Sequence, residues 1–274
     1  MKKTFILSIL LILIFALVFT GCQANEPSQN ETSEEESITI KVGASPVPHA
    51  QILEQVKPIL EEENINLEII EFTDYIQPNI ALADGDLDYN FFQHLIYLES
   101  FAVEHELDII GGVKVHIEPM GLYSNSITSV DELQEGATIA IPNDPTNGGR
   151  ALILLENYGL IELKEGAGLK ATDKDIITNK KNLKFSSLEA AQLPRVIDDV
   201  DAAVINTNYA LEANLSPTED AIIIEDEDSP YPNLIAVRKG EENSEITIAL
   251  ESALTSDTVK EYIQNELQGI IPAF

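Results

Sequence analysis

Apolar and polar residues alternate over short stretches of this chain, and apolar residues recur every three or four positions over longer ones. Alternation is typical of strands, and the longer spacing is typical of amphipathic helices. Between residues 37 and 116 the pattern predicts strands at 37–43, 66–72, 87–92 and 108–116, separated by helices at 46–63, 75–83 and 94–106. Pro58 lies inside the first of these helices and predicts a kink there.

The same alternation of strands and helices begins again after residue 130. Here it predicts a helical turn at 130–133, strands at 137–141, 183–185, 202–205, 221–224 and 234–237, and helices at 145–158, 188–197, 207–213, 246–254 and 258–267. Strands that alternate with helices predict parallel sheets covered on both faces. The chain therefore reads as an α/β protein built from two units. Gly- and Pro-rich loops at 142–149, 164–168 and 228–233 are candidate places for a ligand.

The first residues have the pattern of an export signal. Lys2 and Lys3 precede an almost unbroken apolar run, Phe5 to Phe19, which is shorter than the roughly 20 residues of a transmembrane helix. The sequence Thr20-Gly21-Cys22 resembles a bacterial lipobox, although such sites usually carry Leu where Phe19 stands. We expect a signal peptide over 1–21, a lipid on Cys22 and a flexible acidic tether over 22–37. The protein would then be anchored on the extracytoplasmic face of the cell membrane.

Composition excludes several classes of function. With 47 acidic and 16 basic residues the formal net charge is −31, so the chain repels phosphate backbones and we expect no nucleic-acid partner. Its single Cys rules out an internal disulfide and a Cys-rich zinc site. We expect neither a cofactor nor a resident metal.

Two α/β units behind an export signal favour the substrate-binding protein of a membrane importer, with a secreted hydrolase as the competing class. No G-x-S-x-G or H-E-x-x-H motif occurs, which disfavours catalysis, and we expect no enzyme. A zinc-binding importer lipoprotein is a further alternative, because His residues lie near strand ends and carboxylates are abundant. The sequence has no His-rich acidic loop, which weighs against it.

Five stretches resemble the methionine-binding lipoproteins of ABC importers, the NlpA-type family. They are VGASPVPHAQIL, FFQHLIYLE, AIPNDPTNGGRALILL, EAAQLPRVIDDVDAAVINTNYAL and SPYPNLIAVR, at 42–53, 91–99, 140–155, 189–211 and 229–238. The resemblance implies a two-lobe fold of the periplasmic-binding-protein type (type 2), with the ligand in the cleft between the lobes. It also implies two crossover hinge segments, near Pro119–Ser124 and Asp228–Asn233. The lobes would then comprise 38–120 plus 230–274, and 125–227.

The resemblance also implies that L-methionine is passed to a permease and ATPase pair. D-methionine, a methionine-containing dipeptide or another amino acid remain open as ligands. An amino acid needs partners for its carboxylate, its ammonium and its side chain. We expect Arg150 to bind the carboxylate with two parallel hydrogen bonds. Asn206 ends an apolar strand and Asn233 lies in a predicted crossover; an amide can both donate and accept.

Aromatic rings are suitable neighbours for a thioether, because sulfur is attracted to their edges. Tyr75 and Phe92 are the candidates, with Tyr97 as a weaker one. Phe91 and Phe92 point to opposite sides of a strand, and we expect Phe92 to face the cleft. His94 and His116 complete the predicted binding residues, the first by family resemblance and the second from its position at a strand end near the crossover.

Overall fold

The computed structural model describes residues 37–274. The predicted signal peptide, Cys22 and the predicted tether up to residue 36 lie outside the described residues. None of the helices described here has the length and apolar character needed to cross a membrane.

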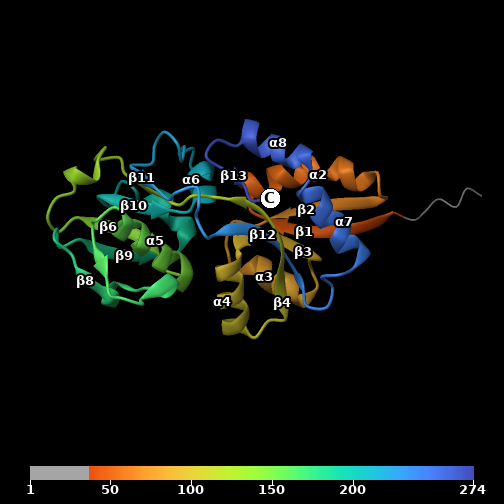
Figure 1. Cartoon of the computed structure of the whole chain (residues 1–274), viewed down its shortest axis with the longest axis horizontal. Coiled ribbons are helices and arrows are strands. Elements are labelled where there is room, and N and C mark those ends of the chain that lie inside the picture. The colour runs from red at the N-terminus through yellow and green to blue at the C-terminus, as the bar shows by residue number, and fades with distance from the viewer. Residues whose placement is uncertain (1–36) are drawn as a thin grey trace, which may run out of the picture. The chain divides into compact units, whose positions relative to one another are not determined.

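Two mixed sheets form the framework of the described chain. The first sheet has six strands, in the order β13 (Ile271–Pro272), β4 (Ile109–Ile117), β12 (Pro232–Arg238), β3 (Tyr89–His94), β1 (Ile38–Ala44) and β2 (Ile65–Glu71). The second has five, in the order β11 (Ile223–Ile224), β5 (Gly121–Tyr123), β10 (Ala202–Ile205), β6 (Thr138–Pro142) and β9 (Lys184–Leu188). A small ribbon pairs β7 (Glu162–Leu163) with β8 (Ile176–Thr178). Figure 1 shows the strands of the two large sheets in separate halves of the fold.

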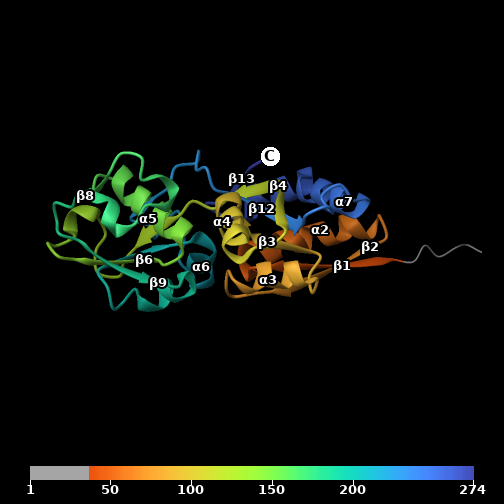
Figure 2. The same cartoon turned by 90° about the horizontal axis from the view of Figure 1, so that it is seen from below.

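Helices cover both faces of the first sheet, as Figures 1 and 2 show. They are α2 (Gln51–Glu61), α7 (Glu245–Leu254) and α8 (Asp257–Glu266) on one face, and α3 (Gln77–Asp84) and α4 (Leu95–His105) on the other. Successive side chains of β12 point to opposite faces of the sheet, and both faces carry apolar residues. Ile235 and Val237 pack against the first group of helices, whereas Leu234 and Ala236 pack against the second.

The second sheet is covered in the same way. In β10, Ala202 and Val204 pack on the side of α5 (Pro145–Asn157), whereas Ala203 and Ile205 face the turns of η5 (Ala190–Val196) and helix α6 (Thr207–Glu212). Every residue of β10 is buried, which is why its sequence is a continuous apolar run. Three further single turns complete the described chain, η2 (Val130–Glu132), η3 (Gly168–Lys170) and η4 (Asp173–Asp175).

The prediction of parallel sheets is confirmed for β1 with β2 and β3 and for β6 with β9 and β10, but not for the whole of either sheet. Strand β12 is antiparallel to both β3 and β4, and β5 is antiparallel to β10 and β11. The cause is the path of the chain, which leaves the first sheet after β4 and returns to it as β12. The predicted crossover at 119–124 was also too long, because Gly121–Tyr123 is already β5 of the second sheet.

Two predicted helices differ from the structure because of proline. The helix expected from Pro46 begins as a separate turn, η1 (Pro46–Ala50), in which Val47 is extended (φ −134°, ψ 134°). The residue before a proline avoids the helical region, and Pro48 follows Val47. The helix expected at 188–197 is instead η5, a run of 3₁₀ turns that contains Pro194, which has no N–H for an α-helical bond. Pro58 is accommodated within α2.

Candidate functional site

A pocket lies where loops and strand ends of the two sheets meet. Six of the seven predicted binding residues line it, namely Tyr75, Phe92, His94, Arg150, Asn206 and Asn233. Gln93, Tyr97, Glu118, Asn147, Thr207 and Asn208 also line it. The first sheet and its loops contribute the aromatic rings, whereas α5 and the start of α6 contribute Arg150 and most of the amides.

Arg150 is held at the pocket by a closely packed helix start. Asp144 caps α5 by accepting a hydrogen bond from the Asn147 backbone N–H at 2.9 Å. The two glycines before Arg150 allow close packing: a Cβ on Gly149 would lie 2.4 Å from the Leu169 carbonyl oxygen, and one on Gly148 would lie 2.8 Å from that of Pro142. The helix can therefore approach its neighbours closely enough for Arg150, 3% exposed, to reach the pocket.

The guanidinium of Arg150 is already partly occupied. Its Nε and Nη2 donate to the two carboxylate oxygens of Glu225 at 2.7 and 2.6 Å, and Nη2 also donates to the Glu118 carbonyl at 2.7 Å. Its Cζ lies 4.3 Å from the centre of the Tyr231 ring. These contacts leave the Nη1 group as the donor for a ligand carboxylate. The predicted grip by two parallel hydrogen bonds needs correction, because Glu225 occupies the Nε–Nη2 edge and the Glu118 carbonyl takes the remaining Nη2 proton.

The asparagines at the pocket offer both hydrogen-bond donors and hydrogen-bond acceptors. Asn206 begins α6, but its side chain does not cap that helix; Nδ2 donates instead to Asn147 Oδ1 at 2.9 Å. Its Oδ1 is buried without a hydrogen-bond partner among the described residues, and so is Nδ2 of Asn208. Asn233 turns its Oδ1 toward His49 Nε2, at 3.2 Å. Unpaired buried polar atoms are costly, so this set is suited to a ligand that both donates and accepts.

Three aromatic rings form the apolar side of the pocket. The centroid of Tyr75 lies 5.7 Å from that of Phe92 and 5.8 Å from that of Tyr97, and Phe92 lies 6.2 Å from Tyr97. Phe92 faces the pocket, whereas Phe91 is fully buried in the core of the first sheet. Tyr75 also connects the two halves of the fold, because its hydroxyl donates to Asn208 Oδ1 at 2.6 Å.

His94 and His116 occupy different positions relative to the pocket. His94 lines it, with Nε2 3.3 Å from Asn147 Oδ1, and burial together with the charge of Arg150 lowers its pKa to about 3. His116 is fully buried on β4 and does not line the pocket. Its Nε2 lies 2.7 Å from Oε1 of Glu118, which places it behind the pocket wall.

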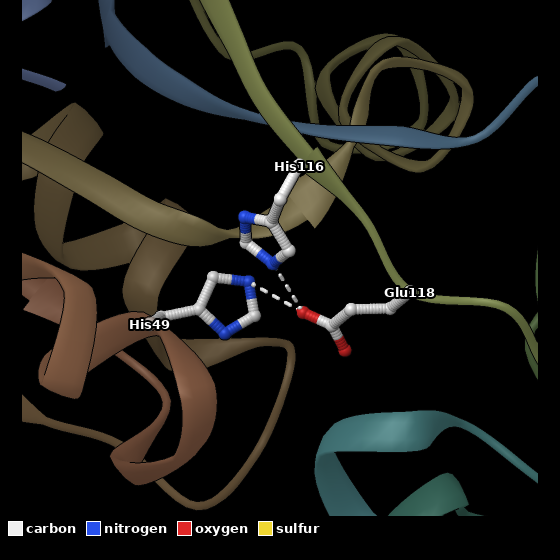
Figure 3. Close-up of side chains that lie close together, drawn as sticks. All are labelled: His49, His116 and Glu118. Atoms are coloured by element: carbon white, nitrogen blue, oxygen red, sulfur yellow. Dashed lines mark hydrogen bonds and ion pairs between the residues drawn. The ribbon is translucent and has the colours of Figure 1, made fainter. Parts of the chain in front are cut away.

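Glu118 is the acidic residue that the sequence analysis missed. It follows β4 directly, 5% exposed, and its Oε1 lies 2.7 Å from His116 Nε2 and 3.1 Å from His49 Nε2 (Figure 3). Its other oxygen accepts a hydrogen bond from the Asn208 backbone N–H at 3.1 Å. Burial raises the pKa of Glu118, although His49 and Arg150 oppose that rise. An acidic residue between an apolar strand and Pro119 was the available sequence signal.

Two imidazole nitrogens and a carboxylate oxygen within 4.8 Å of one another are also a possible ligand set for a metal ion. A metal-bound histidine normally donates its other ring N–H to an acceptor. Nδ1 of His49 and Nδ1 of His116 have no hydrogen-bond partner among the described residues. The arrangement is better satisfied by neutral imidazoles: His116 donates from Nε2 to Glu118 Oε1, whereas the Nε2–H of His49 bonds Asn233 Oδ1 at 3.2 Å and has Glu118 Oε1 3.1 Å away. Burial agrees with this, because it lowers the pKa of His49 to about 4 and that of His116 to about 3.

Fold and pocket together define a ligand-binding protein with two lobes and a cleft between them. The chain belongs to the NlpA lipoprotein family, whose model matches residues 40–274. This confirms the resemblance stated from the sequence. Solved structures of related proteins, described next, confirm the α/β two-lobe fold.

Relatives with solved structures include a nutrient-binding protein from Burkholderia cenocepacia, solved bound to methionine. It is 48% identical, with a TM-score of 0.83 over 86% of this chain and 100% of that one. Lipoprotein Tp32 from Treponema pallidum is 40% identical, with a TM-score of 0.84 over 87% of this chain and 100% of that one. A protein of Vibrio cholerae named probable D-methionine-binding lipoprotein MetQ is 41% identical over 92% of this chain and 91% of its own length.

Proposed function

We propose that this protein is the substrate-binding lipoprotein of an ABC importer and that its ligand is methionine, bound as the free amino acid. The single observation that supports this best is the convergence of Arg150, the pocket amides and three aromatic rings on one pocket. A relative that is 48% identical over nearly the whole described chain was solved bound to methionine. The protein binds and delivers its ligand without altering it.

Each part of the ligand has a proposed partner. Nη1 of Arg150 and Nδ2 of Asn208 bind the carboxylate, because both are donors that no other residue of 37–274 occupies. Asn206 Oδ1 is an acceptor for the ammonium. Asn233, whose Oδ1 faces His49, offers its amide N–H as a further donor to the carboxylate. The thioether lies between Tyr75, Phe92 and Tyr97, where contact with sulfur contributes roughly 0.3–1.5 kcal/mol. His94 fixes Asn147, which in turn orients Asn206.

The lobes close on the ligand by a hinge motion. We place the first lobe at 38–120 plus 230–274, and we extend the second from the expected 125–227 to 121–227, because β5 belongs to its sheet. The hinge then lies in the two chain segments between the sheets. Contacts that exist only when the lobes are together, such as the one from Tyr75 to Asn208, stabilise the closed form. The closed form then delivers the ligand to a permease and its ATPase. A lipid on Cys22 would hold the protein at the extracytoplasmic face of the membrane.

Calorimetry on protein freed of bound ligand tests the proposal. L-methionine should bind one-to-one, and D-methionine, glycylmethionine and zinc should be titrated beside it. The name of the Vibrio cholerae relative makes D-methionine the second ligand to measure. Heat with another solute and none with either form of methionine would overturn the choice of ligand.

A further inference from the structure

Glu118 is a buried carboxylate at the pocket whose negative charge is not matched by a cation. Arg150 is the nearest strong base, but its side chain is paired with Glu225 and reaches only the backbone carbonyl of Glu118. Among residues 37–274 the ion-pair partners of the Glu118 carboxylate are His49 and His116 alone. Both imidazoles are deeply buried, which favours their neutral forms. A buried anion without a positive partner is costly.

The remaining hydrogen-bonding capacity of Glu118 is on one oxygen. A carboxylate offers about four acceptor positions, two on each oxygen. His116 donates to Oε1, His49 Nε2 lies 3.1 Å from the same oxygen, and the Asn208 N–H occupies one position on Oε2. In Figure 3 both imidazoles approach Oε1, and Oε2 points away from them. One acceptor position on Oε2 is therefore left at a residue that lines the pocket.

We propose that Glu118 binds the ligand's α-ammonium group, together with Asn206 Oδ1, and that His49 and His116 are positioning residues that hold the Glu118 carboxylate in place. This rests on the proposed function. An ammonium supplies the missing positive charge and has three N–H donors, enough for both acceptors. The site then selects ligands with a free primary ammonium and rejects N-acylated amino acids, in which that charge is lost and bulk is added.

Comparing ligands with and without the amine tests the assignment. Dissociation constants are measured for L-methionine, 4-(methylthio)butanoate, which lacks the amine, and N-acetyl-L-methionine. Wild-type protein should prefer methionine to both. Glu118→Gln, which keeps the shape of the side chain, should weaken methionine binding at least about tenfold. It should change the affinity for 4-(methylthio)butanoate less than about threefold, because that ligand does not contact the lost charge.

Glu227→Gln is the matched control, since Glu227 is exposed and its loss removes the same charge from the chain. It should leave all three affinities unchanged. An equal loss for methionine and 4-(methylthio)butanoate in Glu118→Gln overturns the assignment of Glu118 while the proposed function stands. Wild-type protein that binds no methionine overturns the proposed function itself.

The positioning role has its own readout in the pH dependence of methionine affinity. The groups that face the Glu118 carboxylate are His49 from η1, His116 from β4, Arg150 from α5 and the Asn208 N–H from α6, with Glu225 behind Arg150. Affinity should fall as acid protonates Glu118. His116→Leu removes a donor to the carboxylate, so the midpoint of that fall should move to higher pH. His116→Gln keeps an N–H donor and should restore it.

An unmoved midpoint in His116→Leu overturns the positioning role. A zinc titration settles whether the cluster is instead a metal site. Stoichiometric zinc binding that is lost in His116→Leu and competes with methionine would overturn the proposal.

Discussion

Arg150 and Glu225 form two parallel hydrogen bonds, from Nε to Oε1 at 2.7 Å and from Nη2 to Oε2 at 2.6 Å. They are 75 positions apart in the chain, and the contact is almost completely shielded from solvent. The pair fixes the plane of the guanidinium, so that Nη1 is presented at the pocket in a defined direction. Glu225 therefore orients the group that we expect to bind the carboxylate.

Arg150→Lys should test this orientation. Lysine keeps the charge but has no planar, two-pronged edge for Glu225, so the ammonium would be poorly placed for the ligand. We expect methionine affinity to fall at least about tenfold, which corresponds to about 1.4 kcal/mol. Calorimetry measures the loss, and Arg195→Lys, on the exposed surface, is the control. Unchanged affinity in Arg150→Lys would remove the two-pronged contact from the explanation.

Phe92→Leu should reduce the preference for sulfur. The ring of Phe92 lies beside Tyr75 and Tyr97, and leucine keeps an apolar side chain without the aromatic edge. Methionine affinity should fall by about two- to tenfold relative to that for norleucine, in which a methylene replaces the sulfur. Competition binding with both ligands measures the ratio. Phe185→Leu, at a partly buried position packed against the core of the second sheet, controls for a general loss of packing. An unaltered ratio in Phe92→Leu would contradict a thioether site between the aromatic rings.

Tyr75→Phe should weaken the closed form. The Tyr75 hydroxyl donates to Asn208 Oδ1 at 2.6 Å across the cleft, and the substitution removes only that donor. A hydrogen bond of this kind contributes about 0.5–1.5 kcal/mol, so we expect methionine to dissociate about two- to tenfold faster. Stopped-flow measurement of the dissociation rate is the test. Tyr158→Phe removes a hydroxyl that bonds the Ile224 carbonyl near the surface and should leave the rate unchanged.

Stability should decline on the acid side of pH 6.5. Burial lowers the pKa of His49 to about 4 and those of His94 and His116 to about 3, from an ordinary 6.5. Each of these histidines takes up a proton on unfolding, so its contribution to stability is present above pH 6.5 and is lost as the pH falls toward those values. The slope is up to about 1.4 kcal/mol per pH unit for each.

The contribution of Glu118 to stability changes with pH in the opposite direction. Its pKa is raised in the folded state, so the contribution is present at low pH and disappears as the pH rises through that raised pKa. Urea unfolding between pH 4 and pH 7 measures the sum of both effects. His116→Gln should flatten the acid decline, whereas His105→Gln, at an exposed position, should not. An acid decline that is the same in His116→Gln as in the wild type would contradict a neutral buried His116.

Cys22→Ser should release the protein from membranes. The substitution removes the only thiol in the chain, and the predicted lipid would have no other attachment point. Fractionation and fatty-acid labelling of expressing cells measure the change. A mutant that still incorporates the label would show that the anchor lies elsewhere.

Many strands and helices could be predicted because they depend on the pattern of neighbouring residues. The continuous apolar run of β10 and the alternating β1 both occur where the pattern placed them, within one residue. The errors have local and non-local causes. Pro194 and Pro48 changed helix types through steric effects of their own rings, whereas the antiparallel placement of β12 depends on where the chain returns to the first sheet.

The site was predicted less completely, for a related reason. Arg150 and Asn206 stood out because a cation in a Gly-rich loop and an amide at a strand end are visible in sequence. Glu118 and Glu225 did not stand out among 47 acidic residues, because Glu225 has no local signal and that of Glu118 is only its place between a strand and Pro119. Their importance arises from partners far away in the chain, His49 for one and Arg150 for the other.

The sequence by itself determined the α/β class, the export-type N-terminal pattern, the family and most of the pocket residues. Each of these depends on the pattern of neighbouring residues or on long stretches that resemble the family. Only the tertiary structure decided which edge of Arg150 is free, that His116 lies behind the pocket rather than on it, and that a carboxylate shared by two imidazoles borders the ligand. Apart from the contact between His116 and Glu118, two positions apart, those relations join side chains more than 60 residues apart in the chain, and burial then sets their charge.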